Sequence, residues 1–196
     1  MLRLPSCGGR DPQNRIIGNK RLGACRRGDA MLTTQDCLRL FKILLVASVG
    51  LFFLFVGITN IEQPSANLTY IKHIFSMDTV FSNNPATWRA ITNPHVHAFV
   101  FWVIVVLEFV FAVLCLAGAL KLALNFRADS NTFQAAKPLA MLGVGLGIIV
   151  WFTGFMVIGG EWFLMWQSEK WSGLQSSFRF TTIMLLILLF LSMREE

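Results

Sequence analysis

The sequence predicts an all-α protein, a four-helix transmembrane bundle with short interfacial helices in its first outer loop. Apolar residues make up 55% of the 196 residues and charged residues only 14%, whereas soluble domains carry about 25% charged residues. The apolar residues fall into four blocks, and tryptophans gather with Glu and Lys between the third and fourth blocks. Tryptophan prefers the boundary between lipid tails and water. That segment therefore indicates a membrane surface.

A basic leader, residues 1–30, precedes the first block. It contains seven Lys or Arg and two Asp, so it carries most of the formal net charge of +6. It has no apolar segment of a secretory signal, and no aromatic residues alternate with its basic ones, so we do not expect nucleic-acid binding. We interpret 1–30 as a disordered leader or a misassigned start. Met31 is then the first residue of a membrane domain, 31–196.

Four apolar segments are long enough to cross a hydrocarbon core, which takes about 20 helical residues. The predicted spans are 38–61, 96–124, 138–165 and 180–193. Pro64 marks the end of the first span, and Pro138 suits the first turn of the third. The fourth span is the shortest, and we expect Phe178 and Arg179 to anchor it at the interface.

The distribution of Lys and Arg predicts the orientation. Basic residues precede the first span and recur in the short loop between spans two and three, at Lys121, Arg127 and Lys137. We therefore expect a multi-pass chain in the inner (plasma) membrane of the cell, with both termini in the cytoplasm. The loops 62–95 and 161–177 should lie outside.

The first outer loop has helical features of its own. Tyr70, Ile74 and Met77 have helical spacing, and Asn83-Asn84-Pro85 predicts a turn before residues 87–91. We expect a short interfacial helix, a turn and a second short helix that lie on the bundle.

Glu108 is the main candidate for chemistry. It lies near the middle of the second span, where a charged carboxylate costs at least ~2.5 kcal/mol. Ala112, Cys115 and Ala119 follow at helical spacing. Because the side chains on this helix face are small, we expect the face to point into the bundle. Two interpretations remain open. One is a protonated carboxyl that hydrogen-bonds a neighbouring helix, and the other is a proton or ion relay.

Glycines of the third span predict close helix packing. Gly143 and Gly147 have the GxxxG spacing, and Gly154 continues the same face. Small residues of this kind let helix backbones approach each other.

A second group of candidates should gather at the outer surface. Its members are His73, Trp88, Arg89, Glu161, Trp162, Trp166 and Arg179. Trp162 and Trp166 are four residues apart and should share a helix face. We expect an Arg–Glu pair to fasten the outer loops to the helix ends. The alternative is a binding mouth for a lipid head group or a quinone.

The sequence lacks the usual signals of a catalytic or metal site. It contains no nucleophile elbow and no paired carboxylates at catalytic spacing, so we assign no catalytic residues and lean against an enzyme. The cysteines Cys7, Cys25, Cys37 and Cys115 form no CxxC pair, and we expect no metal. No cofactor is expected either. Haem is a weaker alternative, because His95 and His97 point to different faces of one helix.

Several motifs resemble the DUF2165 family of small integral membrane proteins of bacteria. The matching residues are Thr59-Asn60, residues 73–79, residues 88–91, Glu108, Gly118, residues 159–168, Trp171, Gly173 and Arg179. The resemblance covers about residues 33–194 and leaves out the leader. It implies a four-span membrane protein and no particular activity. Ser172 departs from the family pattern, in which Asn is expected.

Three functions are consistent with these features. The sequence favours a non-enzymatic structural or accessory module of a membrane complex, with the lipid bilayer and a membrane-protein partner or a second copy as its contacts. The alternatives are a small proton- or ion-coupled transporter or channel that uses Glu108, and a redox subunit that binds haem or quinone.

Overall fold

The computed structural model describes residues 33–195, and the regular structure of that range is entirely helical. Four helices within it are long and apolar enough to cross a membrane: Thr34–Glu62, Pro94–Leu124, Ser130–Trp162 and Leu174–Ser192. The predicted all-α fold with four spans is confirmed. The predicted leader and the alternative start at Met31 lie outside the described residues.

The elements follow one another with short connections. They are α2 (Thr34–Glu62), α3 (Pro64–Ser76), the 3₁₀-helix η1 (Pro85–Arg89), α4 (Pro94–Leu124), α5 (Ser130–Ala136), α6 (Pro138–Ile149), the π-helix η2 (Val150–Trp162), the 3₁₀-helix η3 (Met165–Gln167) and α7 (Leu174–Ser192). The third span, Ser130–Trp162, consists of α5, α6 and η2 and ends before the predicted residue 165. The fourth begins at Leu174, before the predicted residue 180. Both short helices expected in the first loop are present, as α3 and η1.

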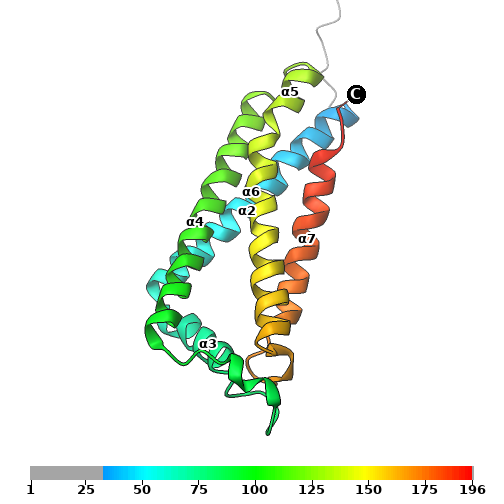
Figure 1. Cartoon of the computed structure of the whole chain (residues 1–196). Coiled ribbons are helices and arrows are strands. Elements are labelled where there is room, and N and C mark those ends of the chain that lie inside the picture. The colour runs from blue at the N-terminus through cyan, green and yellow to red at the C-terminus, as the bar shows by residue number, and fades with distance from the viewer. Residues whose placement is uncertain (1–32, 196) are drawn as a thin grey trace, which may run out of the picture. The chain divides into compact units, whose positions relative to one another are not determined.

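The spans pack side by side and define two ends of the bundle. Figure 1 shows the start of α2, the short α5 and the end of α7 at one end, which we call the terminal end. We call the opposite end, which carries α3, η1 and η3, the loop end. Toward the loop end α4 separates from η2, and α3 lies across this separation (Figure 1).

Proline and capping residues set most helix starts. Pro64, Pro94 and Pro138 each occupy a first-turn position, where the missing N–H costs no hydrogen bond. The Asn93 side chain caps α4, because its oxygen accepts a hydrogen bond from the His95 backbone N–H at 2.9 Å. The boundaries of α4 therefore follow directly from the local sequence.

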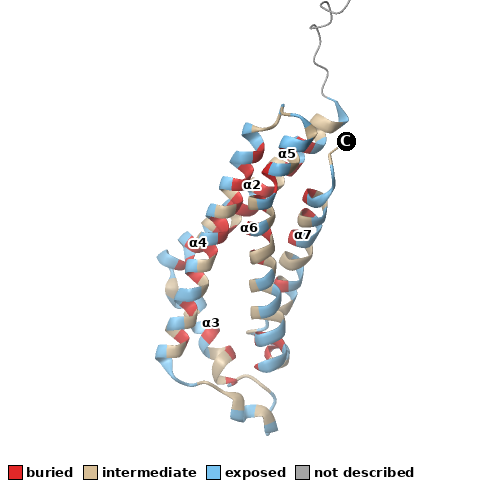
Figure 2. Cartoon of the chain, turned by 45° about the horizontal axis from the view of Figure 1, so that its top comes forward, coloured by how far each residue is buried: buried red, intermediate tan, exposed pale blue. Residues whose placement is uncertain are grey.

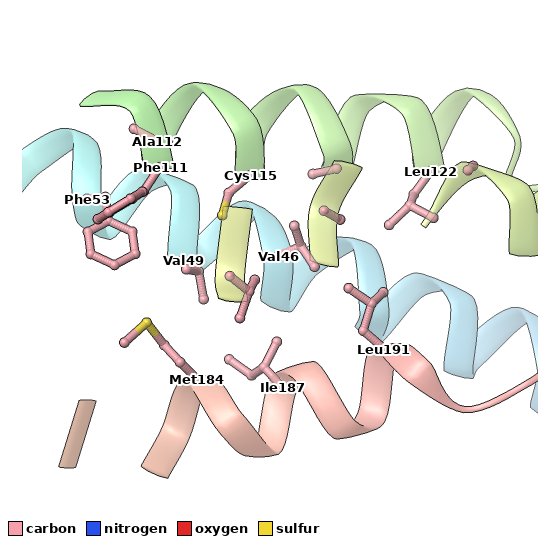
Figure 3. Packing of buried hydrophobic residues seen from close by; sticks show 14 of the residues in the cluster. Val46, Val49, Phe53, Phe111, Ala112, Cys115, Leu122, Met184, Ile187 and Leu191 are labelled. Atoms are coloured by element: carbon pink, nitrogen blue, oxygen red, sulfur yellow. The ribbon is translucent and has the colours of Figure 1, made fainter. Parts of the chain in front are cut away.

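The terminal half of the bundle contains the largest apolar core. In Figure 3, Phe53 of α2 lies against Phe111 of α4, and Met184 and Ile187 of α7 face the same layer. The Phe53 and Phe111 ring centroids are 5.2 Å apart in an edge-to-face arrangement. Cys115 continues this core without exposure to solvent.

Glycines allow α6 to enter that core, as the GxxxG spacing predicts. A Cβ atom at Gly143 would lie 2.8 Å from the Cys115 Sγ atom, and one at Gly147 would lie 2.8 Å from the Phe53 ring. The prediction was wrong for Gly154, where a Cβ would meet no atom within 4 Å. The reason is the change to π-helix at Val150. Because the i→i+5 hydrogen bonds of a π-helix alter the residues per turn, Gly154 leaves the packing face.

The outside of the bundle is apolar, as contact with lipid requires. Figure 2 shows buried positions on the inward sides of the spans and exposed positions on their outer sides. Large apolar side chains, among them Phe55, Phe99, Val106 and Leu186, are at least 60% exposed. Exposed apolar area of this extent is stable in contact with lipid tails and not with water.

Candidate functional site

Glu108 lies inside the bundle, on the inward face of α4, and is only 5% exposed. The Asn60 side chain of α2 donates a hydrogen bond from Nδ2 to the Glu108 Oε2 atom at 2.7 Å. The Asn60 Oδ1 atom in turn accepts a hydrogen bond from Asn67 of α3. This chain of three polar side chains joins three helices and leads from the buried acid to Asn67, which is exposed at the loop end.

The second carboxyl oxygen of Glu108 is available for a further interaction. Glu108 Oε1 has no hydrogen-bond partner among residues 33–195, whereas Oε2 is bound by Asn60. This oxygen is not one of the buried, unpartnered side-chain atoms among residues 33–195, so it is accessible from the cavity beside it. Its surroundings are therefore relevant to function.

Glu108 lines a cavity of about 290 Å³, which we call the polar chamber. Its wall consists of Val56, Asn60, Asn67, Tyr70, Ile71, Phe101, Ile104, Glu108, Trp151, Phe155, Ser172, Gly173 and Ser176. The polar side chains in this wall belong to α2, α3, α4 and the start of α7. The chamber extends from exposed Ser172 and Asn67 at the loop end to the buried carboxyl.

A second cavity of about 410 Å³, the apolar chamber, lies beside the first. Its wall consists of Tyr70, Ile71, Ile74, Phe75, Val100, Ile104, Leu107, Ile149, Val150, Thr153, Gly154, Phe155, Ile158, Gly159 and Met165. Tyr70, Ile71, Ile104 and Phe155 belong to both walls. The two chambers are thus separated only by shared side chains, and each is of the size of small-molecule pockets, about 300–1,000 Å³.

The π-helix η2 forms one side of both chambers. Trp151 and Phe155 face the polar chamber, while Gly154 and Ile158 line the apolar one. π-Helical segments are rare and occur frequently at functional sites. The wider helix therefore places two rings and a glycine next to the candidate site.

Tyr70 stands between the chambers and is neutral at physiological pH. Its hydroxyl donates a hydrogen bond to the Met165 Sδ atom at 2.8 Å. Burial raises the pKa of Tyr70 to about 12, against the opposing effect of the Gly173 backbone. The Tyr70 side chain is thus a neutral group in the wall that the two chambers share.

The polar chamber ends at a packed apolar layer. Phe53, Phe111 and Cys115, which follow on the terminal side of Glu108, are each 1% exposed or less. Glu108 is therefore accessible from the loop-end side of the chamber, because these three side chains fill the space on its terminal side.

Arg89 interacts with indole rings at the loop end. Its guanidinium carbon lies 5.5 Å from the Trp88 ring centroid and 4.7 Å from that of Trp162. Its Nη1 atom donates a hydrogen bond to the Trp162 carbonyl oxygen at 3.3 Å. The expected Arg–Glu pair does not form with exposed Glu161, because the two rings and this carbonyl hold the guanidinium.

The two tryptophans of the predicted common face belong to different elements. The helix ends at Trp162, and Leu164 adopts a left-handed backbone with a φ of 54°. Trp162 therefore packs on Trp88 at 6.1 Å between ring centroids, and Trp166 packs on Phe81 at 5.9 Å. The expected i, i+4 pair was wrong, since the chain turns between its members.

The histidines and Arg179 have separate partners. His73 Nδ1 lies 2.8 Å from Asp78 Oδ2, and the His73 ring stacks on Trp171. Arg179 Nη2 donates to the Ser176 Oγ atom at 3.4 Å. Buried His97 contacts the Ile91 carbonyl oxygen through Nε2 at 2.7 Å, so this nitrogen is engaged with the backbone. The predicted outer cluster is thus divided into several local contacts.

Comparison of the sequence with models of known protein families shows which family the chain belongs to. The sequence model of a family described as "Predicted small integral membrane protein (DUF2165)" matches residues 38–194. The chain belongs to this family. No curated protein and no solved structure matches the chain. The matched DUF2165 region contains Glu108, the residues of both chambers and all four spans except the first four residues of the first.

In this DUF2165 chain a second polar cluster, at the terminal end, was missed by the sequence interpretation. The Lys42 and Lys137 ammonium groups lie 2.6 Å and 2.8 Å from the Glu195 Oε1 atom, and Arg39 Nε lies 3.5 Å from Oε2. Lys42 and Lys137 also donate to the Met193 carbonyl oxygen. The pattern of basic residues predicts only the orientation, because sequence spacing does not show that the folded helices bring these side chains together.

The charge of Glu195 is favoured by its neighbours. Burial by itself would raise the pKa of the Glu195 carboxyl, but the hydrogen bonds and charges of Lys137 and Lys42 outweigh burial. They hold that pKa below its usual range. The cluster therefore fixes the segment after α7 against α2 and α6.

Proposed function

We propose that this protein is a non-enzymatic membrane module that binds an amphipathic small molecule in the loop-end half of its bundle. The observation that carries this proposal is the pair of adjoining chambers, one polar around Glu108 and one apolar. A ligand with a polar head and an apolar body would match both surfaces. The free Oε1 atom of Glu108 would provide the directional contact that fixes its position.

The packed layer beneath Glu108 favours binding over transport. A proton or ion path would have to continue past Phe53, Phe111 and Cys115, which are fully buried. Water-free apolar packing opposes the passage of charge. A site that packed side chains close on its terminal side is the arrangement expected of a binding protein.

Extraction of the purified protein tests this proposal. Full-length protein is purified in a mild detergent, and its organic extract is analysed by mass spectrometry beside that of the Glu108→Ala variant. We expect an amphiphile that the wild type retains in near-equal molar amount and the variant retains at least about tenfold less, since a hydrogen bond to a buried group is lost. Equal retention by both proteins would contradict the proposal.

An accessory role in a larger membrane complex is part of the same proposal. It is supported by the aromatic side chains of Phe81, Trp88 and Trp166, which the loop end exposes by 48% or more. Affinity capture from mild detergent should recover a stoichiometric membrane-protein partner. Recovery of a homo-oligomer without any other protein would contradict the accessory role. It would not contradict the proposed ligand binding.

We infer, further, that both termini face the cytoplasm and that the loop end faces the outside of the inner membrane. The support is the excess of Lys and Arg at the terminal end, where Arg39, Lys42 and Lys137 lie. In this orientation the polar chamber opens toward the periplasmic side.

A further inference from the structure

We propose that the ligand is a quinone with a long hydrocarbon substituent, or a molecule of the same chemistry, with a flat carbonyl-bearing ring and an apolar tail. This inference rests on the proposed ligand-binding function and concerns binding alone. Three properties of the chambers support it: the rings around the polar chamber, the state of Glu108, and the wall of the apolar chamber.

Aromatic side chains give the polar chamber a shape suited to a flat head. Tyr70, Phe101, Trp151 and Phe155 all contribute to its wall. Trp151 and Phe155 are stacked, with ring centroids 4.5 Å apart and an interplanar angle of 17°. Flat rings pack on such surfaces in offset or edge-to-face contact.

Glu108 offers a hydrogen-bond donor to the head. The wall of the polar chamber contains no Lys, Arg or His, and a charged carboxylate at this depth is costly. The neutral acid is therefore the state that the surroundings favour. Because Asn60 Nδ2 donates to Oε2, the proton belongs on Oε1. A carbonyl oxygen of the ligand can accept it.

The same charge arrangement disfavours a phospholipid head. A phosphate group requires cationic or multiple N–H donors, and the polar chamber supplies an acid and no cation. A neutral ring with acceptor oxygens has no such requirement.

The apolar chamber suits a hydrocarbon tail. Except for Thr153, its wall presents aliphatic or aromatic side chains, a thioether and glycines. It shares Tyr70, Ile71, Ile104 and Phe155 with the polar chamber, so one molecule can extend from Glu108 into both. The tail would lie between α4 and η2.

Two glycine variants test occupancy of the apolar chamber. A Cβ at Gly154 or at Gly145 would meet no atom within 4 Å, but only Gly154 lines a chamber. Gly154→Leu should therefore fill the tail space, while Gly145→Leu is its matched control. A decyl-substituted benzoquinone is titrated into full-length protein in detergent, and quenching of tryptophan fluorescence is followed. We expect wild type and Gly145→Leu to bind, and Gly154→Leu to bind at least about tenfold more weakly.

Two Glu108 variants test the chemistry of the head. In Glu108→Gln the amide can still accept from Asn60 and donate to the ligand, so affinity for the benzoquinone should stay within about threefold of wild type. Glu108→Ala should bind about tenfold more weakly. Thermal unfolding of both variants checks that the bundle is intact. Equal loss in Gln and Ala would show that an amide donor cannot replace the carboxyl, which overturns the assigned hydrogen bond from a neutral donor to the quinone head.

The outcomes separate this inference from the proposed function. The wild type could retain a phospholipid that Gly154→Leu does not retain, and bind no benzoquinone. That result would overturn the quinone inference, but the proposed ligand-binding function would stand. Absence of any retained amphiphile together with absence of benzoquinone binding would overturn both.

Discussion

Asn60 is the residue on which the Glu108 site depends, because it donates to the acid and accepts from Asn67. It is 3% exposed, so no water replaces it readily. The site thus consists of one acid with a fixed donor on one oxygen and a free second oxygen. Its geometry is determined by contacts between α2, α3 and α4.

Removal of the Asn60 amide should therefore destabilise the protein. Asn60→Ala leaves the Glu108 carboxyl and the Asn67 amide without their partner, and a buried unsatisfied group costs about 1–3 kcal/mol. Thermal or denaturant unfolding in detergent measures this loss. Asn131→Ala, at an exposed position of α5, is the control and should change stability by less than about 0.5 kcal/mol. Equal stability of the two variants would contradict a structural role for Asn60.

At the scale of elements, the segment after α7 is held by charge. The Glu195 carboxylate forms ion pairs with Lys42 of α2 and with Lys137 at the start of α6. It therefore connects the end of α7 to α2 and α6 at the terminal end. Breaking a buried ion pair by removing one partner leaves an uncompensated charge. This contact therefore affects the packing of α7 on the bundle.

The lowered pKa of Glu195 predicts an acid-sensitive bundle. A carboxyl with a depressed folded pKa contributes stability that is complete above its unfolded value, about 4.3. That stability is lost as pH falls through the lower folded value. Thermal midpoints from neutral pH to about pH 3 should fall for wild type and fall less for Glu195→Gln, which should start on the order of 3 kcal/mol less stable. Exposed Glu62→Gln is the control and should follow wild type.

Much of this element-level structure could be predicted from the sequence. The spans follow from apolar length, and the inward face of Glu108 follows from the small residues that share it. The π-helix could not be predicted, since no residue in 150–162 marks a change of helix type. Its register explains why Gly154 lines a chamber and does not pack. The left-handed turn at Leu164, which separates Trp162 from Trp166, has no glycine to mark it. The partners Asn60, Asn67 and Glu195 depend on contacts between helices far apart in sequence.

At the scale of the whole molecule, orientation determines which compartment reaches the polar chamber. With the terminal end in the cytoplasm, a C-terminal fusion to green fluorescent protein should fluoresce, and the matching fusion to alkaline phosphatase should be inactive. If the green fluorescent protein fusion does not fluoresce and the alkaline phosphatase fusion is active, the loop end faces the cytoplasm. The chambers themselves would be unchanged, but their entrance would face the other compartment.

The proposed function requires that the loop-end half of the bundle hold one amphipathic molecule in two joined chambers. Native mass spectrometry of full-length protein released from detergent tests it directly. We expect one added mass on wild type and on Gly145→Leu, and its loss from Gly154→Leu, because of these two glycines only Gly154 borders the apolar chamber. An added mass of equal occupancy on all three proteins, or none on wild type, would contradict it.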